Sequence, residues 1–92
     1  MQASIDISLY PLAEAQFKKD IWQFIFSLRE VEGLKVVTNG MSTQVFGEYD
    51  LAVNAVMQQI KIAHQQLGSA VFVCKFIAGE RSLDAPEAEP EL

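Results

Sequence analysis

The sequence predicts an α+β fold in the order strand, helix, strand, strand, helix, strand. Three observations predict it: a period-two alternation near the start, two segments with helical spacing, and an Asn-Gly pair between two β-branched runs. This order is the split βαβ, or ferredoxin-like, arrangement, in which one four-stranded antiparallel sheet carries both helices on one face. Right-handed crossovers would place the first and third strands at the centre of the sheet.

The first predicted strand covers residues 3–10. Its odd positions are apolar, and its even positions hold Ser4, Asp6, Ser8 and Tyr10. This alternation is typical of a strand with one buried face. We expect Pro11 to end the strand, because proline lacks the N–H donor that a ladder needs.

Residues 13–31 change to helical spacing. Their apolar stripe consists of Phe17, Ile21, Phe24, Ile25 and Leu28. Gly33 follows and can adopt the left-handed conformation that commonly ends a helix. Trp22 and Phe26 lie one turn apart outside the stripe. They are therefore either isolated surface aromatics or part of a contact between chains.

Two β-branched runs, LKVV and TQVF, flank the Asn-Gly pair. Such a pair is the strongest short signal of a hairpin, because both residues accept positive φ in a type I′ turn. A two-residue turn would pair Thr38 with Met41. The alternation then puts Ser42 and Thr43 on opposite faces of the hairpin, with Thr43 on the face toward the helices, so we do not expect both to touch one ligand.

A second helix is predicted over residues 50–67, with Asp50 as its N-cap and Gly68 just past its end. His64 lies on the apolar stripe of this helix, where a hydrogen-bonded, partly buried histidine is the plainer interpretation. Residues 69–77 are rich in β-branched and aromatic side chains and form the last predicted strand.

One ferredoxin-like domain is expected over residues 1–80, followed by an acidic, proline-containing and mostly disordered tail over residues 81–92. The four acids of this tail account for most of the net charge of −5, so the folded part is nearly neutral and has no basic stripe. Nucleic acid is therefore not an expected partner. A domain of this size has a thin core, which association between chains commonly supplements.

Cys74 is the single cysteine, so no disulfide can form within the chain, and a reducing compartment suits it. The first ten residues lack the features of a signal peptide, and no stretch approaches the roughly 20 apolar residues of a membrane span. We therefore expect a cytoplasmic protein without a membrane partner. No metal site is expected, because His64 is the single histidine and Cys74 is predicted some distance along a strand.

The predicted topology brings polar side chains from four segments to one end of the sheet. These side chains are Ser8, Tyr10, Thr38, Asn39, Met41, Ser42, Thr43 and His64. The other end holds Gly33, Glu48 and Asp50, which are ordinary turn and cap residues. A gathering of hydroxyl, amide, aromatic and thioether groups indicates a small-molecule site.

Two motifs, “ISLYPL” within residues 5–12 and “TNGMSTQVFGE” at residues 38–48, carry a resemblance. Together they resemble the small thiamine/hydroxymethylpyrimidine-binding protein family, which was formerly of unknown function, and the resemblance covers nearly all of residues 3–80. It implies binding of thiamine or its pyrimidine half, no catalysis, no cofactor, and assembly through sheets into homodimers or homotetramers. The candidate ligand-binding residues are Ser8, Tyr10, Thr38, Met41, Ser42 and Thr43.

The chemistry of these residues is compatible with an aminopyrimidine. Serine and threonine hydroxyls can donate or accept, and Tyr10 could stack on the ring. A thiazolium cation would favour a nearby carboxylate, and Asp6 lies on the same strand face as Ser8. The plainer interpretations are turn and strand propensity for Ser42 and Thr43, a core-edge role for Tyr10, and a solvated or interface-paired carboxylate for Asp6.

Two rival functions differ in class from a binding protein. One is a structural homo-oligomeric module without a ligand. The other is an acylphosphatase-like hydrolase, which would need a glycine-rich loop and an arginine to hold phosphate. The segment after the first strand, residues 11–19, contains neither, so we expect no enzyme and no catalytic residues.

Overall fold

The computed structural model describes residues 1–12 and 17–83, and in them the elements follow one another in the predicted order. They are β1 (Gln2–Pro11), α1 (Phe17–Arg29), β2 (Lys35–Thr38), β3 (Thr43–Glu48), α2 (Tyr49–Leu67) and β4 (Ala70–Ala78). The first helix was predicted to begin at residue 13, but residues 13–16 lie outside the described residues. So does most of the predicted tail, residues 84–92.

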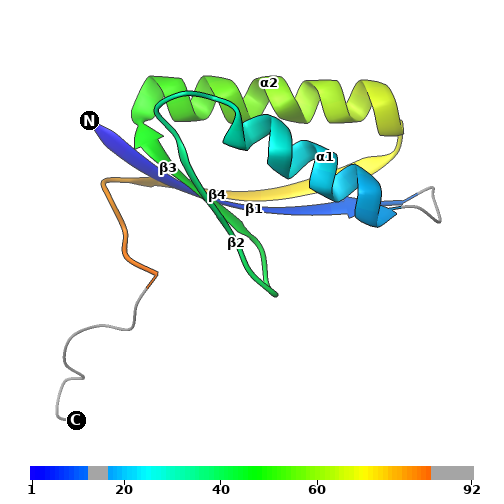
Figure 1. The fold of residues 1–92 in the computed structure, drawn as a ribbon, viewed down its shortest axis with the longest axis horizontal. Coiled ribbons are helices and arrows are strands. Elements are labelled where there is room, and N and C mark those ends of the chain that lie inside the picture. Colours follow the sequence, from blue (N-terminus) through cyan, green and yellow to red (C-terminus); the bar gives the residue numbers. More distant parts are fainter. Residues whose placement is uncertain (13–16, 84–92) are drawn as a thin grey trace, which may run out of the picture.

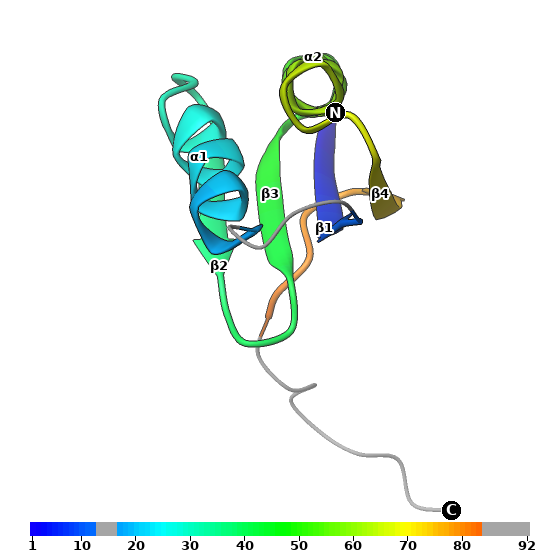
Figure 2. The ribbon, with the colours of Figure 1, turned by 90° about the vertical axis from the view of Figure 1, so that its right-hand side faces the viewer.

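The four strands form one antiparallel sheet in the order β2-β3-β1-β4, which confirms the ferredoxin-like prediction with β1 and β3 at the centre. Both helices pack on the same face of this sheet (Figures 1 and 2). Helix α1 packs toward β2, and α2 packs over β1, β3 and β4. We call the face without helices the open face.

The core lies between the helices and the sheet. Ile5 of β1, Leu28 of α1, Val45 of β3 and Val56 of α2 are fully buried there. Ile7, on the same face of β1 as Ile5, joins them. The alternation along β1 therefore separates core residues from open-face residues as predicted.

Strand β1 ends at Pro11, one residue beyond the predicted range, and Pro11 is itself paired with Ala70. The carbonyl of Gln2 and the N–H of Leu12 both bond to the β4 side, so the even residues of β1 direct their backbone groups toward β4. Pro11 is odd, and its missing N–H faces the other side. Pairing with β3 has already ended there at Ile7, so no ladder bond is lost.

The hairpin between β2 and β3 has a wider loop than predicted. Thr38 pairs with Thr43 instead of Met41, and neither Asn39 nor Gly40 has positive φ, so the turn is not type I′. The Asn39 side chain explains the difference, because its Oδ1 accepts the backbone N–H groups of Met41 and the following residue at 3.0 and 3.2 Å. The register differs from the prediction by two residues, so the paired side chains of both strands keep their predicted faces. Met41 does not: it was predicted to share the helix side with Thr38, but in the wider loop it lies on the open face.

Helix α2 differs from the prediction in its cap and its buried stripe. Glu48 is the N-cap instead of Asp50, and its carboxylate accepts the backbone N–H of Leu51 at 2.9 Å. The buried stripe consists of Ala52, Val56 and Ala63, and it leaves His64 exposed. Gly68, with φ of 71°, ends the helix as predicted. Within residues 1–12 and 17–83, no helix is long and apolar enough to cross a membrane.

The outer surface of α1 carries the two aromatic residues that fall off its stripe. Trp22 and Phe26 are about half exposed, and their ring centroids lie 5.6 Å apart. The guanidinium of Arg29 lies 5.7 Å from each ring centroid. This cluster covers no part of the core, in agreement with the predicted helical spacing.

Candidate functional site

The open face of the sheet is hollowed. The hollow has a volume of about 550 Å³, and strands β1, β3 and β4, the β2–β3 loop and the chain after β4 contribute to it. We call it the open-face hollow. Its lining includes Ser4, Asp6, Ser8, Tyr10, Met41, Ser42, Gln44, Phe46, Val73, Lys75, Ile77, Arg81, Ser82 and Leu83.

Residues 79–83 form one wall of the hollow. After β4 the chain turns at Gly79, with φ of 101°, and runs along the side of the sheet that faces away from the helices (Figure 2). The buried Ser4 holds it there. Its hydroxyl donates to the carbonyl of Gly79 and accepts the backbone N–H of Arg81, both at 2.9 Å.

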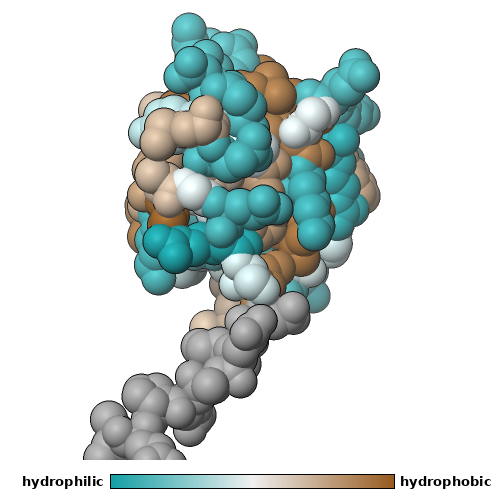
Figure 3. All heavy atoms as spheres, turned by 90° about the vertical axis from the view of Figure 1, so that its left-hand side faces the viewer, coloured by the Kyte–Doolittle hydropathy of each residue, from teal (hydrophilic) through white to brown (hydrophobic). Residues whose placement is uncertain are grey.

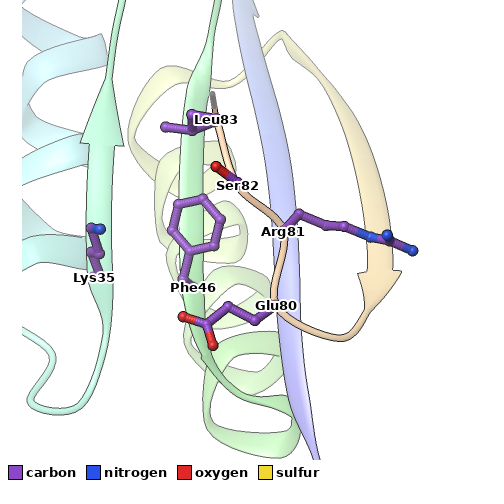
Figure 4. A pocket seen from close by; sticks show the side chains of 6 residues that line it. All are labelled: Lys35, Phe46, Glu80, Arg81, Ser82 and Leu83. Carbon is purple, nitrogen blue, oxygen red and sulfur yellow. The ribbon is translucent and has the colours of Figure 1, made fainter. Parts of the chain in front are cut away.

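A second hollow of about 520 Å³ lies between this segment, Phe46 and Lys35 (Figure 4). Lys35 places its ammonium 5.9 Å from the ring centroid of Phe46. The side chain of Arg81 extends from the segment toward β4, away from Phe46 (Figure 4). The guanidinium of Arg81 therefore lies on the β1–β4 side of the open face, in the open-face hollow (Figure 4).

The centre of the open-face hollow is a hydrogen-bonded carboxylate. Ser42 Oγ donates to Asp6 Oδ1 at 2.5 Å, and Gln44 Nε2 donates to the same oxygen at 2.9 Å. Gln44 Nε2 also lies 2.7 Å from Ser42 Oγ, and Gln44 Oε1 accepts Asn39 Nδ2 at 2.9 Å. The network therefore ties the β2–β3 loop to the central strand, which accounts for the short polar side chains of that loop.

The electrostatics of Asp6 favour the charged form. Burial raises the pKa of Asp6, but the hydrogen bonds from Ser42 and Gln44 and the positive charge of Lys75 outweigh it, so the pKa lies below its ordinary value. Cys74, next to this region but on the helix side of β4, has its pKa raised by burial and by the charge of Asp6. Asp6 is thus an ionised acceptor at neutral pH, and Cys74 is a neutral thiol.

Four of the six predicted ligand-binding residues line the open-face hollow: Ser8, Tyr10, Met41 and Ser42. The other two do not line it. Thr38 and Thr43 lie on the helix side of the hairpin, where their hydroxyl oxygens are 2.9 Å apart and Thr43 is buried. Ser42 and Thr43 therefore point to opposite faces, as the alternation predicted.

His64 also lies away from the hollow. Its Nε2 donates to the carbonyl of Ala70 at 3.2 Å, and its ring meets the ring of Phe72 edge-on at 5.1 Å. It is hydrogen-bonded as expected, but exposed instead of partly buried. In the part of the chain that the structure describes, no group of three or more His, Cys, Asp or Glu side chains is placed to hold a metal ion.

The sequence reasoning did not include Gln44, Lys75 and Arg81 among the site residues. Alternation alone could have placed Gln44 and Lys75 on the open face beside Asp6, since both are its register partners. No local signal places Arg81, because its position depends on the distant Ser4. The end of the molecule where α2 begins, away from the β2–β3 loop, has a mostly hydrophilic surface with some hydrophobic patches (Figure 3).

Comparison with known proteins identifies the fold. No family model and no curated protein matches the chain. A solved structure from Streptococcus pneumoniae matches with a TM-score of 0.73 and 20% identity, over 87% of this chain and 89% of that one. A domain of unknown function, DUF77, from Bacillus cereus matches with a TM-score of 0.61 and 18% identity, over 91% and 85% of the two chains.

A third solved structure has a functional description. It is a candidate thiamine biosynthesis/salvage protein from Thermotoga maritima, with a TM-score of 0.75 and 18% identity, over 86% of this chain and 85% of that one. Likeness at these identities establishes a shared fold that extends over most of both chains.

Proposed function

We propose that this protein is a non-catalytic binding protein for thiamine or its hydroxymethylpyrimidine half, acting in the cytoplasm as a carrier, buffer or sensor in vitamin salvage. The observation that carries the proposal is the open-face hollow. Ser8 and Tyr10 from one motif line it together with Met41 and Ser42 from the other, although the two motifs are far apart in sequence. A solved structure of the same fold, described as a candidate thiamine salvage protein, supports the proposal.

The composition of the hollow suits a flat aminoheterocycle. Its volume falls within the 300–1,000 Å³ that is usual for small-molecule sites, which combine apolar walls with a few oriented polar groups. Tyr10 and Met41 offer an aromatic face and a thioether, and both are largely exposed, hence free to close on a ligand. Asp6 and Ser42 supply an oriented acceptor and a hydroxyl for ring nitrogens and an amino group.

Calorimetric titration with thiamine and with hydroxymethylpyrimidine tests the proposal. We expect saturable binding to the wild type, and an affinity lower by roughly fivefold in Tyr10→Ala, since an aromatic stack contributes about 1 kcal/mol. Met41→Ala should weaken binding more than Met57→Ala, because Met57 is an exposed methionine on α2, outside the hollow. Absence of heat with both compounds at millimolar concentration would remove the proposal.

A second candidate function is a self-associating structural module without a ligand, and the outer edge of β4 favours self-association. Strand β4 ends the sheet, has nine residues, and exposes Val71, Val73 and Phe76 by about half. A long, apolar edge strand is a template for pairing with another chain. We propose that copies of this chain form a homodimer or homotetramer, with or without ligand.

Sedimentation velocity over a range of concentrations tests the assembly. The carbonyl of Ser69 and the N–H of Gly79 bond to β1, so the even residues between them direct their N–H groups outward. Phe76→Pro therefore removes an N–H group that points away from β1, so it breaks no hydrogen bond between β1 and β4. It should shift the protein toward monomer. A monomeric wild type at all concentrations contradicts this part of the proposal.

A further inference from the structure

We propose that the open-face hollow selects a phosphorylated aminopyrimidine. Asp6 would accept a hydrogen bond from the amino group, and Lys75 and Arg81 would bind the phosphate. The inference rests on the proposed function, because it names the form of the ligand that the same site prefers. It follows from the distribution of charge and of free hydrogen-bonding atoms in the hollow.

Asp6 has one carboxylate oxygen available. Ser42 and Gln44 both donate to Oδ1, and within residues 1–12 and 17–83 no group donates to Oδ2. No polar side-chain atom in the described residues is both buried and unpartnered, so Oδ2 is open to the hollow. Because the network fixes the orientation of the carboxylate, Oδ2 is a preorganised acceptor for an N–H group of a ligand.

Two cations lie beside this acceptor. Lys75 is the register partner of Asp6 on β4, and the side chain of Arg81 extends toward β4 from the opposite wall (Figure 4). Both are exposed, both line the hollow, and within the described part of the chain neither is held in an ion pair. The Ser4 hydroxyl anchors the backbone of Arg81, so this guanidinium stays near the hollow.

The balance of charge decides between possible ligands. With Asp6 negative and Lys75 and Arg81 positive, the hollow carries a net positive charge, which disfavours a ligand whose only charge is a thiazolium cation. An anionic group is attracted instead, and guanidinium with ammonium is a suitable pair for phosphate.

The spacing also fits a phosphorylated aminopyrimidine. Neighbouring strands lie about 4.8 Å apart, and Asp6 on β1 is paired directly with Lys75 on β4. The backbone positions of the acceptor and the ammonium group are therefore separated by one inter-strand spacing. A pyrimidine that carries an amino group and a phosphorylated hydroxymethyl group on adjacent ring atoms presents its hydrogen-bond donor and its anionic phosphate side by side. One ligand can therefore reach both strands.

The test is a calorimetric titration with hydroxymethylpyrimidine, with its phosphate ester and with inorganic phosphate. We expect the wild type to bind the ester at least roughly tenfold more tightly than the alcohol. In the double variant Lys75→Gln, Arg81→Gln this preference should fall to within about twofold. Asp6→Asn should weaken the alcohol more than the ester, because it also removes a negative charge that opposes the phosphate, and millimolar inorganic phosphate should compete with the ester only.

The matched control is Lys18→Gln, Lys61→Gln, which removes two exposed lysines from the helices and should keep the full preference for the ester. Lys75 and Arg81 are also exposed, so their substitution is not expected to unfold the domain, and circular dichroism checks this. Equal binding of ester and alcohol by the wild type overturns the inference and leaves the proposed function intact. Failure of both compounds, and of thiamine, to bind overturns the proposed function itself.

Discussion

The two faces of the sheet are held by different interactions. The helix face buries apolar side chains such as Ile5 and Ile7, whereas the open face holds Asp6 and Ser8 in a solvated, hydrogen-bonded hollow. These residues alternate along the single strand β1. The comparison teaches that one strand can carry the core on one face and a candidate binding site on the other, so substitutions one residue apart should separate stability from the proposed binding.

The largest expected effect is on the helix face. Leu28→Ala should lower the free energy of unfolding by about 3 kcal/mol, because Leu28 is fully buried and its truncation leaves a cavity. Urea denaturation measures the change, and Met57→Ala, at an exposed site, should cost less than about 0.5 kcal/mol. Equal losses in the two variants would mean that the stability does not reside in the core described above.

Next is a close contact at the edge of the same face. A Cβ added to Gly47 would lie 2.6 Å from Leu34 Cδ2 and 3.1 Å from the carbonyl oxygen of Gly33. We expect Gly47→Ala to cost about 1–2 kcal/mol, because the Leu34 side chain must repack and the Gly33 carbonyl must give way slightly to admit the methyl group. Gly40→Ala is the control, since its added Cβ meets no atom within 4 Å and its φ is not positive. Thermal unfolding of the two variants should differ accordingly.

A smaller effect is expected from the open face, and it depends on pH. Asp6→Asn should cost about 1 kcal/mol at pH 7, through weaker hydrogen bonds from Ser42 and Gln44. The pKa of Asp6 is lower folded than unfolded, so its stabilisation is present above the unfolded value of about 3.9 and is lost as the pH falls through the folded value. Denaturation at pH 7 and below pH 3 should show the difference between wild type and variant shrinking. An unchanged difference would contradict the role given to the charge.

The smallest effects should appear in binding. Ser42→Ala removes a donor to Asp6 in the hollow, and we expect the affinity for hydroxymethylpyrimidine to fall by roughly threefold. Thr38→Val alters a hydroxyl on the helix side, which bonds to Thr43, and should leave the affinity within about twofold of the wild type. Parallel titrations decide the matter: a larger loss in Thr38→Val than in Ser42→Ala would contradict the assignment of the site to the open face.

Local patterns predicted most of the fold. The alternation along residues 3–10 predicted both faces of β1, because a period of two is a property of the strand itself. The faces of the paired hairpin strands were also predicted correctly, since an error of two residues in register changes no orientation there, but Met41 in the loop lies on the face opposite to the predicted one. The loop conformation was not, because the side-chain hydrogen bonds of Asn39 favour a wider loop than its propensity indicates.

The candidate site was predicted in part. Convergence at one end of the sheet brought together Ser8, Tyr10, Met41 and Ser42, which the hollow also includes. It wrongly grouped them with His64. The prediction considered only which residues lie at the same end of the sheet, but side chains at one end meet only if they also lie on the same face. The wall formed by residues 79–83 could not be predicted, since it depends on a hydrogen bond between Ser4 and Gly79, which are 75 residues apart.

The position of Trp22 has a practical consequence for optical work. Trp22 is the only tryptophan of the chain; it is partly exposed on α1 and is not among the residues that line the hollow. Its indole emission should therefore be insensitive to a ligand that enters the hollow, where Tyr10 is the nearest fluorophore. The same emission becomes a selective reporter of whatever covers Trp22 and Phe26 when protein concentration rises.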